Sequence, residues 1–442
     1  MTAKKNSANI RRLALELLDS YEAGEKYVNL VLNSPALNGL CGEDMGRLTA
    51  LLYTTVERKI TYDYLISALS GRSIDKISPK ARNILRLGLC QILHMDKIPD
   101  FASVNETVKL AGSKSEQGFV NAILRRAVKE KDFLPYPKRE KSVARYLSVT
   151  YSVPQPTVKF FIRQLGEEGA EALLRTTLVT PPLSLTVNTA LISRDELMAK
   201  LSRLEPEISK YTENGIIINK KIPPKNIEGF DRGEFFVQDE SSRIAVQALG
   251  VTDGMSVIDL CAAPGGKSFA AAIAAGKEGV VYSRDLHESK LSLIECGAAR
   301  LSVDNIKVEP WDATKPDESL IGKMDRVICD VPCSGLGVFS KKPDLRYKDI
   351  SAIEELPSLQ YSILEVAAKY LKPGGRIVYS TCTLNPAENG EVTDKFIEAH
   401  PEFSYLGFKV GELSAEEGKI TLYPHIHGTD GFYIALMRKS DD

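Results

Sequence analysis

The sequence lacks the features of secreted, membrane-bound and zinc-binding proteins. It has no run of about 18 apolar residues, which a membrane-spanning helix needs, and no apolar stretch near its N-terminus typical of a signal peptide. Its seven cysteines are scattered and form no Cys-x-x-Cys pair, and its five histidines are dispersed. We therefore expect no bound metal, no membrane partner and a reducing, cytoplasmic environment.

The net charge of −1 would by itself argue against a nucleic-acid partner, but the charge is unevenly distributed. Residues 1–145 hold 24 Lys and Arg against 16 Asp and Glu, a net charge of +8, and the remainder carries −9. This asymmetry suggests a basic binding module attached to an acidic enzyme domain. On charge alone, a helical domain with a well-solvated lysine surface is an equally good interpretation.

At 442 residues the chain is too long for one core, and its patterns predict three domains. Residues 1–140 read as helices, with apolar residues spaced by three and four, and end in a basic, proline-rich linker. Residues 141–236 mix helices with two strands, Leu183–Val187 and Gly215–Ile218, as in a small α+β module.

From residue 237 to 442, strands alternate with helices, which predicts an α/β domain with a doubly wound parallel sheet. The last two expected strands read as a closing hairpin. The expected strands are Ser256–Leu260, Gly279–Ser283, Asn305–Glu309, Arg326–Asp330, Gly375–Thr381, Lys419–Tyr423 and Gly431–Met437.

A tight, glycine-containing turn follows the first of these strands, in the run Asp259 to Lys267. It matches neither GxGxxG nor the P-loop, yet its glycines allow close backbone approach, and the helix that follows presents N–H groups to an anionic group. Asp285, just past the second strand, stands where an acid would bind ribose hydroxyls, and Asp312 could bind an adenine amino group. An acidic turn and a capped helix are the structural alternatives for these two aspartates.

Two cysteines follow strands directly: Cys333 in Asp-Val-Pro-Cys-Ser-Gly and Cys382 in Ser-Thr-Cys-Thr. Residues past the carboxyl ends of parallel strands line the ligand crevice, so both thiols are expected in one site. Accessible thiols suggest nucleophilic catalysis, whereas Cys90, Cys296 and Cys329 fit the commoner role of small core residues.

These three motifs, in this order and spacing, resemble those of the RNA (cytosine-5)-methyltransferases. The second cysteine motif continues into Asn385–Asn389, as it does in that family. DNA cytosine-5 methyltransferases differ, because their nucleophile is the cysteine of the Pro-Cys motif. The helical N-terminal region, with its run Phe119–Arg126, is similar to the NusB-like RNA-binding domain of RsmB-type 16S rRNA methyltransferases.

The resemblance implies a role for each matching position. Cys382 would attack C6 of a cytosine, Cys333 would assist product release, and Asp330 would contact the ring near N3. Lys267 would contact an anionic cofactor group or the reacting site. S-adenosylmethionine would be the cofactor, held by Cys261, Ala262, Ala263, Pro264, Gly265, Gly266, Lys267, Asp285, Asp312 and Asp330.

The expected partner is 16S rRNA, on its own or within an assembling small subunit, contacted by Arg125 and Arg126 of a monomeric protein. The motifs alone leave a tRNA substrate open. A non-catalytic RNA-binding assembly factor is a further alternative, which the presence of both thiols and of the Pro-Gly-Gly turn disfavours.

Overall fold

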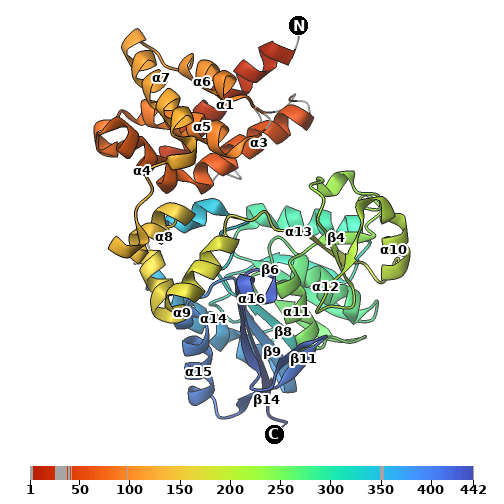
Figure 1. The fold of residues 1–442 in the computed structure, drawn as a ribbon. Coiled ribbons are helices and arrows are strands. Elements are labelled where there is room, and N and C mark those ends of the chain that lie inside the picture. Colours follow the sequence, from red (N-terminus) through yellow and green to blue (C-terminus); the bar gives the residue numbers. More distant parts are fainter. Residues whose placement is uncertain are drawn as a thin grey trace. The chain divides into compact units, whose positions relative to one another are not determined.

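The computed structural model divides the chain into two compact units (Figure 1). Unit 1 comprises residues 1–179 and 342–350, and unit 2 comprises residues 180–341 and 351–442. Within these limits the structure describes residues 3–24, 37, 40, 42–96, 98–348 and 353–441. No helix in this described part is long and apolar enough to span a membrane.

The helices of unit 1 between residues 3 and 129 pack around one apolar core, as the sequence predicts for the N-terminal region (Figure 1). Helix α5 is central, and its Ile84 and Leu85 are fully buried. It begins where the sequence predicts, because Ser78 accepts the N–H of Ala81 at 3.3 Å and Pro79 occupies the first turn. The helices are α1 (Ala3–Glu22), α3 (Gly42–Glu57), α4 (Lys59–Ser70), α5 (Pro79–His94), α6 (Asp100–Val108), α7 (Lys114–Lys129), α8 (Val143–Tyr151) and α9 (Gln155–Thr176).

The sequence places a domain boundary at residue 140, after the proline-rich linker. In the structure, unit 1 continues past this linker to residue 179. Helix α8 is tied to α4, since the Thr61 hydroxyl donates to the Val149 carbonyl at 2.6 Å and the N–H of Ile60 donates to the Ser152 hydroxyl at 3.0 Å. The expected middle module, residues 141–236, is therefore divided. Its helices α8 and α9 belong to unit 1, and its strands belong to unit 2.

A short segment from late in the sequence completes unit 1. Here the chain leaves unit 2 and forms the 3-10 helix η7 (Pro343–Tyr347). The fully buried guanidinium of Arg346 donates hydrogen bonds of 3.1–3.3 Å to the carbonyls of Glu57, Tyr151 and Thr177. These carbonyls lie at the C-terminal ends of α3, α8 and α9, so one cation meets the negative ends of three helix dipoles.

We predict that Arg346→Ala destabilises unit 1 by about 3–5 kcal/mol, because it leaves buried carbonyls without a donor. Arg346→Lys should recover only part of this loss, since one ammonium lacks the planar fork of a guanidinium. Urea denaturation, with hydrogen exchange of the amides of α3 and α8, measures the effect. Arg12→Ala, which removes an exposed arginine of the same unit, should stay within about 0.5 kcal/mol; an equal loss in both variants would contradict the role of Arg346.

Unit 2 is built on a mostly parallel sheet with the strand order β10-β14-β9-β8-β5-β6-β7 and β13 beside β14, which confirms the expected doubly wound domain. The strands from β9 to β7 are parallel neighbours, and β14 runs antiparallel to β9, β10 and β13. The order reverses between β5 and β8, and ligands bind at such switch points. The bounds are β5 (Ser256–Asp259), β6 (Val280–Asp285), β7 (Ile306–Pro310), β8 (Met324–Asp330), β9 (Leu371–Thr381), β10 (Phe403–Tyr405), β13 (Lys419–Leu422) and β14 (Phe432–Lys439).

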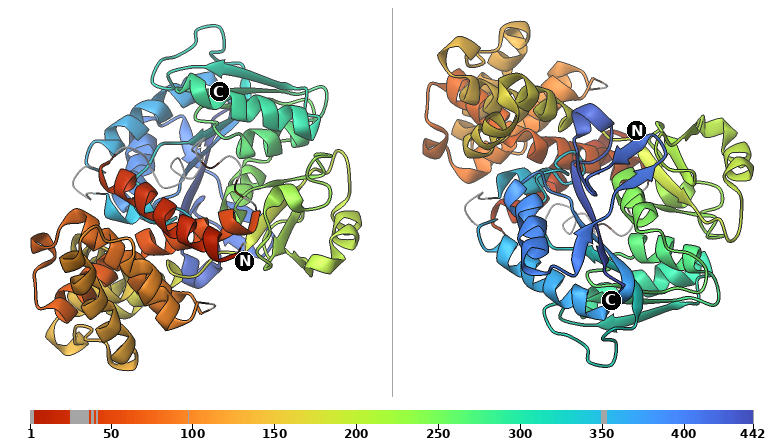
Figure 2. Two further views of the ribbon diagram at one scale, coloured as in Figure 1. Left: turned by 90° about the horizontal axis from the view of Figure 1, so that it is seen from above. Right: turned by 90° about the horizontal axis from the view of Figure 1, so that it is seen from below.

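Helices cover both faces of this sheet (Figure 2). Val257 and Ile328 pack in one apolar cluster, and their neighbours Ile258 and Val327 pack in the other, as the alternation of side chains along a strand requires. One face is covered by α11 (Glu240–Leu249), α12 (Gly266–Ala275) and α13 (Glu288–Leu301), and the other by α14 (Leu356–Tyr370) and α15 (Gly390–Ala399).

The strands of the expected middle module form a smaller antiparallel sheet with the order β2-β3-β1-β4, in which β2 is Glu207–Ile208 and β4 is Phe235–Val237. The predicted strands Leu183–Val187 and Gly215–Ile218 are confirmed as β1 and β3. Five strands in the described part of unit 2 have no counterpart in the sequence prediction, because each is only two or three residues long and too short to show an alternating pattern. They are β2, β4, β10 and the hairpin of β11 (Phe408–Val410) and β12 (Leu413–Ala415).

Two of the three cysteines expected in the core are buried, namely Cys90 and Cys329. The expectation is wrong for Cys296, which is exposed on α13. The apolar side of that helix carries Leu291 and Ile294 at helical spacing, and Cys296 points away from it.

Candidate active site

Cys333 and Cys382 lie at the carboxyl ends of two adjacent parallel strands, β8 and β9. The strand register places Asp330 opposite Ser380, so the loops that follow leave the sheet side by side. The two sulfur atoms are 3.1 Å apart. This separation is longer than the roughly 2.05 Å of a disulfide bond and is a close contact between two thiol groups.

The hydrogen bond to Cys382 and burial both raise the pKa of the Cys333 thiol well above its usual value. Cys333 therefore keeps its proton near neutral pH and can donate it toward the sulfur of Cys382. Each of the two residues retains partial solvent exposure. The pair thus combines a protonated thiol with a second sulfur that a substrate can approach.

A buried carboxylate, that of Glu388, positions both cysteine loops. It accepts the N–H and the hydroxyl of Ser334 at 2.8 and 2.6 Å, beside Cys333. It also accepts the side-chain amides of Asn385 at 3.1 Å, in the loop after Cys382, and of Gln360 at 3.1 Å, on α14. Glu388 is not among the site residues expected from the sequence, although an acid inside the motif that follows Cys382 is a signal for such a role.

Asn389 holds the end of strand β9. Its side-chain oxygen accepts the Thr381 hydroxyl at 2.5 Å, and its amide donates to the Thr383 carbonyl at 3.0 Å. These bonds fix the backbone on both sides of Cys382. The Asn385–Asn389 motif therefore serves to shape the loop that presents this cysteine.

Asp330 and Lys267 form an ion pair across the switch point. The Lys267 ammonium donates to one carboxylate oxygen of Asp330 at 2.7 Å, and the Ser380 hydroxyl donates to the other at 2.6 Å. Lys267 is nearly buried, and it also donates to the Ser242 hydroxyl at 3.2 Å and lies over the Phe432 ring. Asp330 is thus held in one orientation while part of its side chain stays accessible.

The expected cofactor loop joins β5 to α12. Gly265 has φ +111°, and a Cβ there would meet the Phe269 ring at 2.4 Å, so the position requires glycine. The first N–H groups of α12, from Gly266 onward, have no acceptor within the helix and can bind a carboxylate. Beneath the loop, burial raises the pKa of Asp259 to about 7, and its carboxyl accepts the Ser268 hydroxyl at 2.7 Å.

Asp285 and Asp312 end β6 and follow β7, in the places the sequence predicts. Asp285 is buried and accepts the N–H groups of Ala263 at 3.2 Å and His287 at 3.0 Å, which aim the carboxylate along the cofactor loop. Asp312 accepts the N–H and hydroxyl of Thr314 at 3.0 and 2.6 Å. These bonds form a local turn closed by an aspartate, which is the structural alternative that the sequence left open for this residue.

The structure brings most of the expected site residues together at this edge of the sheet. Burial raises the pKa of the Cys261 thiol well above its usual value, so Cys261 is unreactive. Arg125 and Arg126 are exposed on α7 of unit 1, where Arg126 pairs with Glu130. Over the described ranges, no group of three His, Cys, Asp or Glu side chains could hold a metal ion.

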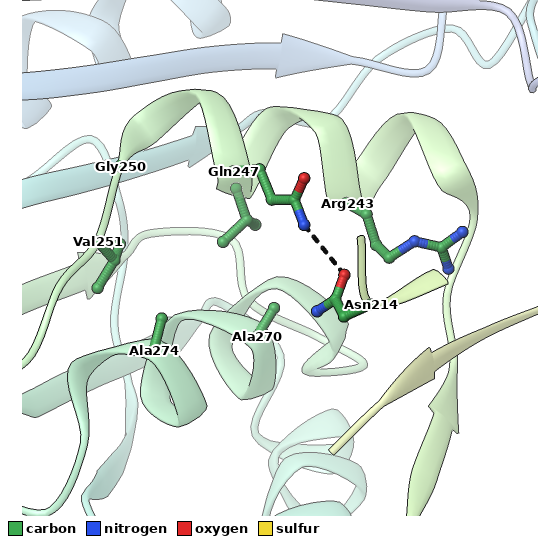
Figure 3. A pocket seen from close by; sticks show the side chains of 8 residues that line it. Asn214, Arg243, Gln247, Gly250, Val251, Ala270 and Ala274 are labelled. Atoms are coloured by element: carbon green, nitrogen blue, oxygen red, sulfur yellow. Dashed lines mark hydrogen bonds between the residues drawn. The ribbon is translucent and has the colours of Figure 1, made fainter. Parts of the chain in front are cut away.

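A separate cavity of about 220 Å³ lies between α11 and α12 (Figure 3). Its lining combines apolar side chains such as Val251 and Ala270 with polar ones, among them Asn214 and Gln247, which form a hydrogen bond with each other. None of the residues around it is an expected site residue. It is therefore distinct from the site of the two thiols.

A shared lysine links the start of α11 to the loop before β14. Lys341 donates to Asp239, which caps α11, and to Asp430 at 2.7 Å. Burial, together with repulsion from Asp239, raises the pKa of Asp430 to about 7. Attraction to Lys341 outweighs burial at Asp239 and lowers its pKa to about 2. One ammonium thus stabilises one ionised carboxylate, and the second carboxyl keeps its proton to near neutral pH.

Comparisons with known proteins agree with this architecture. Residues 246–438 match the family described as 16S rRNA methyltransferase RsmB/F, and residues 8–129 match the NusB family. The chain is 37% identical to the probable ribosomal RNA small subunit methyltransferase B of Bacillus subtilis, with 99% of each chain covered. The Synechocystis protein of the same name is 32% identical, over 97% of this chain and 99% of the relative. The crystal structure of PH0851 shares 26% identity and a TM-score of 0.79, over 98% of this chain and 99% of that one.

Fold and family together define an S-adenosylmethionine-dependent RNA methyltransferase with a Rossmann-like catalytic domain. The chain belongs to the RsmB/F family of 16S rRNA methyltransferases, and its N-terminal region is a NusB domain. The resemblance inferred from the motifs is confirmed.

Because Asp430 keeps a proton in the fold that the unfolded chain releases near pH 3.8, its contribution to stability should fall as pH rises from about 4 to 7. Asp430→Asn imitates the protonated form at every pH. We predict that this variant gains stability relative to the natural protein between pH 5 and pH 8, by up to about 3 kcal/mol. Chemical denaturation at both pH values measures the difference. Asp304→Asn, at an exposed position of unit 2, should show no such trend, and a constant difference for Asp430→Asn would refute the argument.

Proposed function

We propose that the protein methylates C5 of a cytosine in 16S rRNA through a covalent bond between Cys382 and C6. The observation that carries this proposal is the 3.1 Å contact between the sulfurs of Cys333 and Cys382 at the ends of adjacent strands. Two thiols in contact can divide the formation and the breaking of a sulfur–carbon bond between them. A single structural cysteine would need neither the pairing nor the partial exposure.

The chemistry explains why a nucleophile is required. C5 of cytosine is a poor nucleophile, and addition of the Cys382 thiolate to C6 moves electron density onto it. When bound, S-adenosylmethionine supplies an electrophilic methyl group on a sulfonium sulfur, which C5 then accepts. Loss of the C5 proton and cleavage of the Cys382–C6 bond restore the ring double bond and regenerate the thiolate.

The assignment of roles to the two cysteines follows the resemblance of their motifs to those of the RNA (cytosine-5)-methyltransferases, in which Cys382 would attack and Cys333 would assist release of the product. The raised pKa of the Cys333 thiol, caused by its hydrogen bond to Cys382 and by burial, is consistent with this assignment. Either thiol can donate in the contact between the two sulfurs, and donation from Cys333 would stabilise a Cys382 thiolate. Glu388 and Asn389 hold the loops so that both sulfurs meet one ring.

Asp330 and Lys267 complete the catalytic group. Asp330 would contact the cytosine near N3 and hold the ring while electron density shifts. The bonds from Lys267 and Ser380 orient its carboxylate before the substrate arrives. Lys267 acts mainly through Asp330 and contributes a positive charge at the boundary of the cofactor loop.

The residues at the loop fit S-adenosylmethionine. The segment Cys261–Lys267 would approach the amino-acid part of the cofactor through its backbone, Asp285 would bind the ribose hydroxyls, and Asp312 the adenine amino group. Each oxygen of Asp285 has one backbone donor and a second lone pair for a hydroxyl. The carboxylate of Asp330 closes the site on the β8 side.

We propose the NusB domain as the RNA-binding module. Its net charge of +8 over residues 1–145 favours phosphate contacts, to which the exposed Arg125 and Arg126 would contribute. The named relatives are small-subunit methyltransferases, which supports 16S rRNA as the substrate, free or in an assembling particle. We expect the protein to act in the cytoplasm as a monomer.

The two cysteines should be distinguishable by what their loss leaves behind. Cys382→Ala removes the nucleophile, so methylation should stop and no adduct should form. Cys333→Ala should still attack and methylate but release the RNA poorly, leaving a protein–RNA adduct that is stable on a denaturing gel with substrate RNA and S-adenosylmethionine. The double variant should form none. An adduct in Cys382→Ala alone would reverse the roles, and unchanged turnover in both single variants would exclude covalent catalysis.

Asp285→Ala should weaken S-adenosylmethionine binding about ten-fold to a hundred-fold, because it removes charge-assisted hydrogen bonds worth roughly 1.5–3 kcal/mol each. Isothermal calorimetry measures the affinity. Asp304→Ala, which removes an exposed carboxylate from the same unit, is the matched control and should leave the affinity unchanged. Full affinity in Asp285→Ala would remove this residue from the cofactor site.

A further inference from the structure

A groove of about 770 Å³ lies on unit 1. Arg125 and Arg126 are not among the residues that line it. Its walls come from α4 and the turn after it, from α8 and from the first residue of α9. The residues of α4 that line the groove are three or four positions apart and so share one face of the helix. Arg145, Ser148 and Val149 share one face of α8 for the same reason. The volume is within the range of about 300–1,000 Å³ that is typical of ligand sites.

Two arginines at this groove are held by aromatic rings. The guanidinium carbon of Arg145 lies 5.6 Å from the centroid of the Tyr64 ring, and that of Arg72 lies 5.1 Å from the centroid of the Phe119 ring. Both arginines are exposed, and each distance is within the roughly 6 Å of a cation–π contact. Such contacts orient a guanidinium without neutralising its charge.

Neither arginine forms an ion pair with a carboxylate in the part of unit 1 that the structure describes, in contrast to Arg47 and Arg126. Arg47 pairs with Glu43, and Arg126 pairs with Glu130 at 2.8 Å. Charge and hydrogen-bonding capacity at Arg72 and Arg145 therefore remain available to a ligand.

The carboxylate that lines the groove does not offset this charge. Asp63 receives two hydrogen bonds of 2.7 Å from the guanidinium of Arg86, whose side chain is almost fully buried. The remaining polar side chains at the groove, such as Ser73 and Gln155, are neutral donors and acceptors. The groove thus presents positive charge, aromatic surface and neutral hydrogen-bonding groups together.

We propose that this groove binds an unpaired segment of the RNA substrate. Arg72 and Arg145 would each bind a backbone phosphate in bidentate fashion, and a splayed base would stack on the Arg145–Tyr64 pair. Charge with aromatic surface is the combination that single-stranded nucleic acids require, whereas a duplex hides its base faces. The inference rests on the proposed function, because it names how the RNA substrate is held.

The test compares RNA affinity in full-length variants. Arg72→Ala/Arg145→Ala should bind a small-subunit rRNA fragment at least about ten-fold more weakly than the natural protein at low salt. The slope of log affinity against log salt should become shallower by about 0.7 for each lost phosphate contact. Tyr64→Ala should weaken binding about five-fold or more while leaving the salt slope unchanged.

The matched control is Arg12→Ala/Arg47→Ala, which removes the same charge from α1 and α3 of the same unit. Its RNA affinity should fall by less than about three-fold. An equal loss in both double variants would assign binding to overall charge and overturn the groove, as would unchanged affinity in Arg72→Ala/Arg145→Ala. Unlabelled single-stranded RNA should compete for wild-type binding better than duplex RNA, and a better duplex competitor would also overturn the proposal.

Two further measurements separate this inference from the proposed function. Calorimetry with S-adenosylmethionine should give the natural affinity in all groove variants, which shows that unit 2 is intact, and hydrogen exchange of α4 and α8 verifies the fold of unit 1. Failure of the natural protein to methylate cytosine C5 would refute the proposed function, while the affinity comparison would still decide the groove. Normal methylation with unchanged affinity in the double variant refutes the groove alone.

Discussion

The arrangement of both reactive sulfurs depends on one buried carboxylate, that of Glu388. A carboxylate away from water is costly unless several donors surround it. Here the donors belong to different loops, with Ser334 beside Cys333 and Asn385 in the loop after Cys382. Satisfying the charge therefore requires the two loops to come together. The two sulfurs therefore lie close together for two reasons. Hydrogen bonds to the Glu388 carboxylate draw the two loops together, and the adjacent strands β8 and β9 place the starts of these loops side by side.

Charges around the cofactor loop follow the same principle. Lys267 lies between the loop and Asp330, and it compensates a carboxylate that must stay partly accessible. Asp259, which has no such partner, has its pKa raised to about 7 by burial. The site thus combines a carboxylate that Lys267 orients, at Asp330, with a protonatable group beneath the loop, at Asp259.

Unit 1 depends on a cation contributed by the sequence of the catalytic half. Arg346 lies where α3, α8 and α9 all end, and without it the carbonyls at these ends would compete for few donors. The segment that carries it follows Lys341, which is held in unit 2 by Asp239 and Asp430. The stretch between the Cys333 loop and η7 is therefore anchored at both ends. The chain connects the proposed RNA-binding unit to the reactive loop by a second covalent path.

The sequence alone determined the order of the strands along the chain, the helical character of the N-terminal region and the motif cysteines, because each depends on local spacing and on residue chemistry. The expected β5 to β9 strands, β13 and β14 are all present with small shifts at their ends. Only the tertiary structure decided which groups meet: that Glu388 serves both loops, that η7 belongs to unit 1 and that Cys296 is exposed. These features depend on contacts between residues far apart in the chain. A buried charge or carbonyl needs a hydrogen-bond partner, and no periodic pattern in the sequence shows which distant residue provides it.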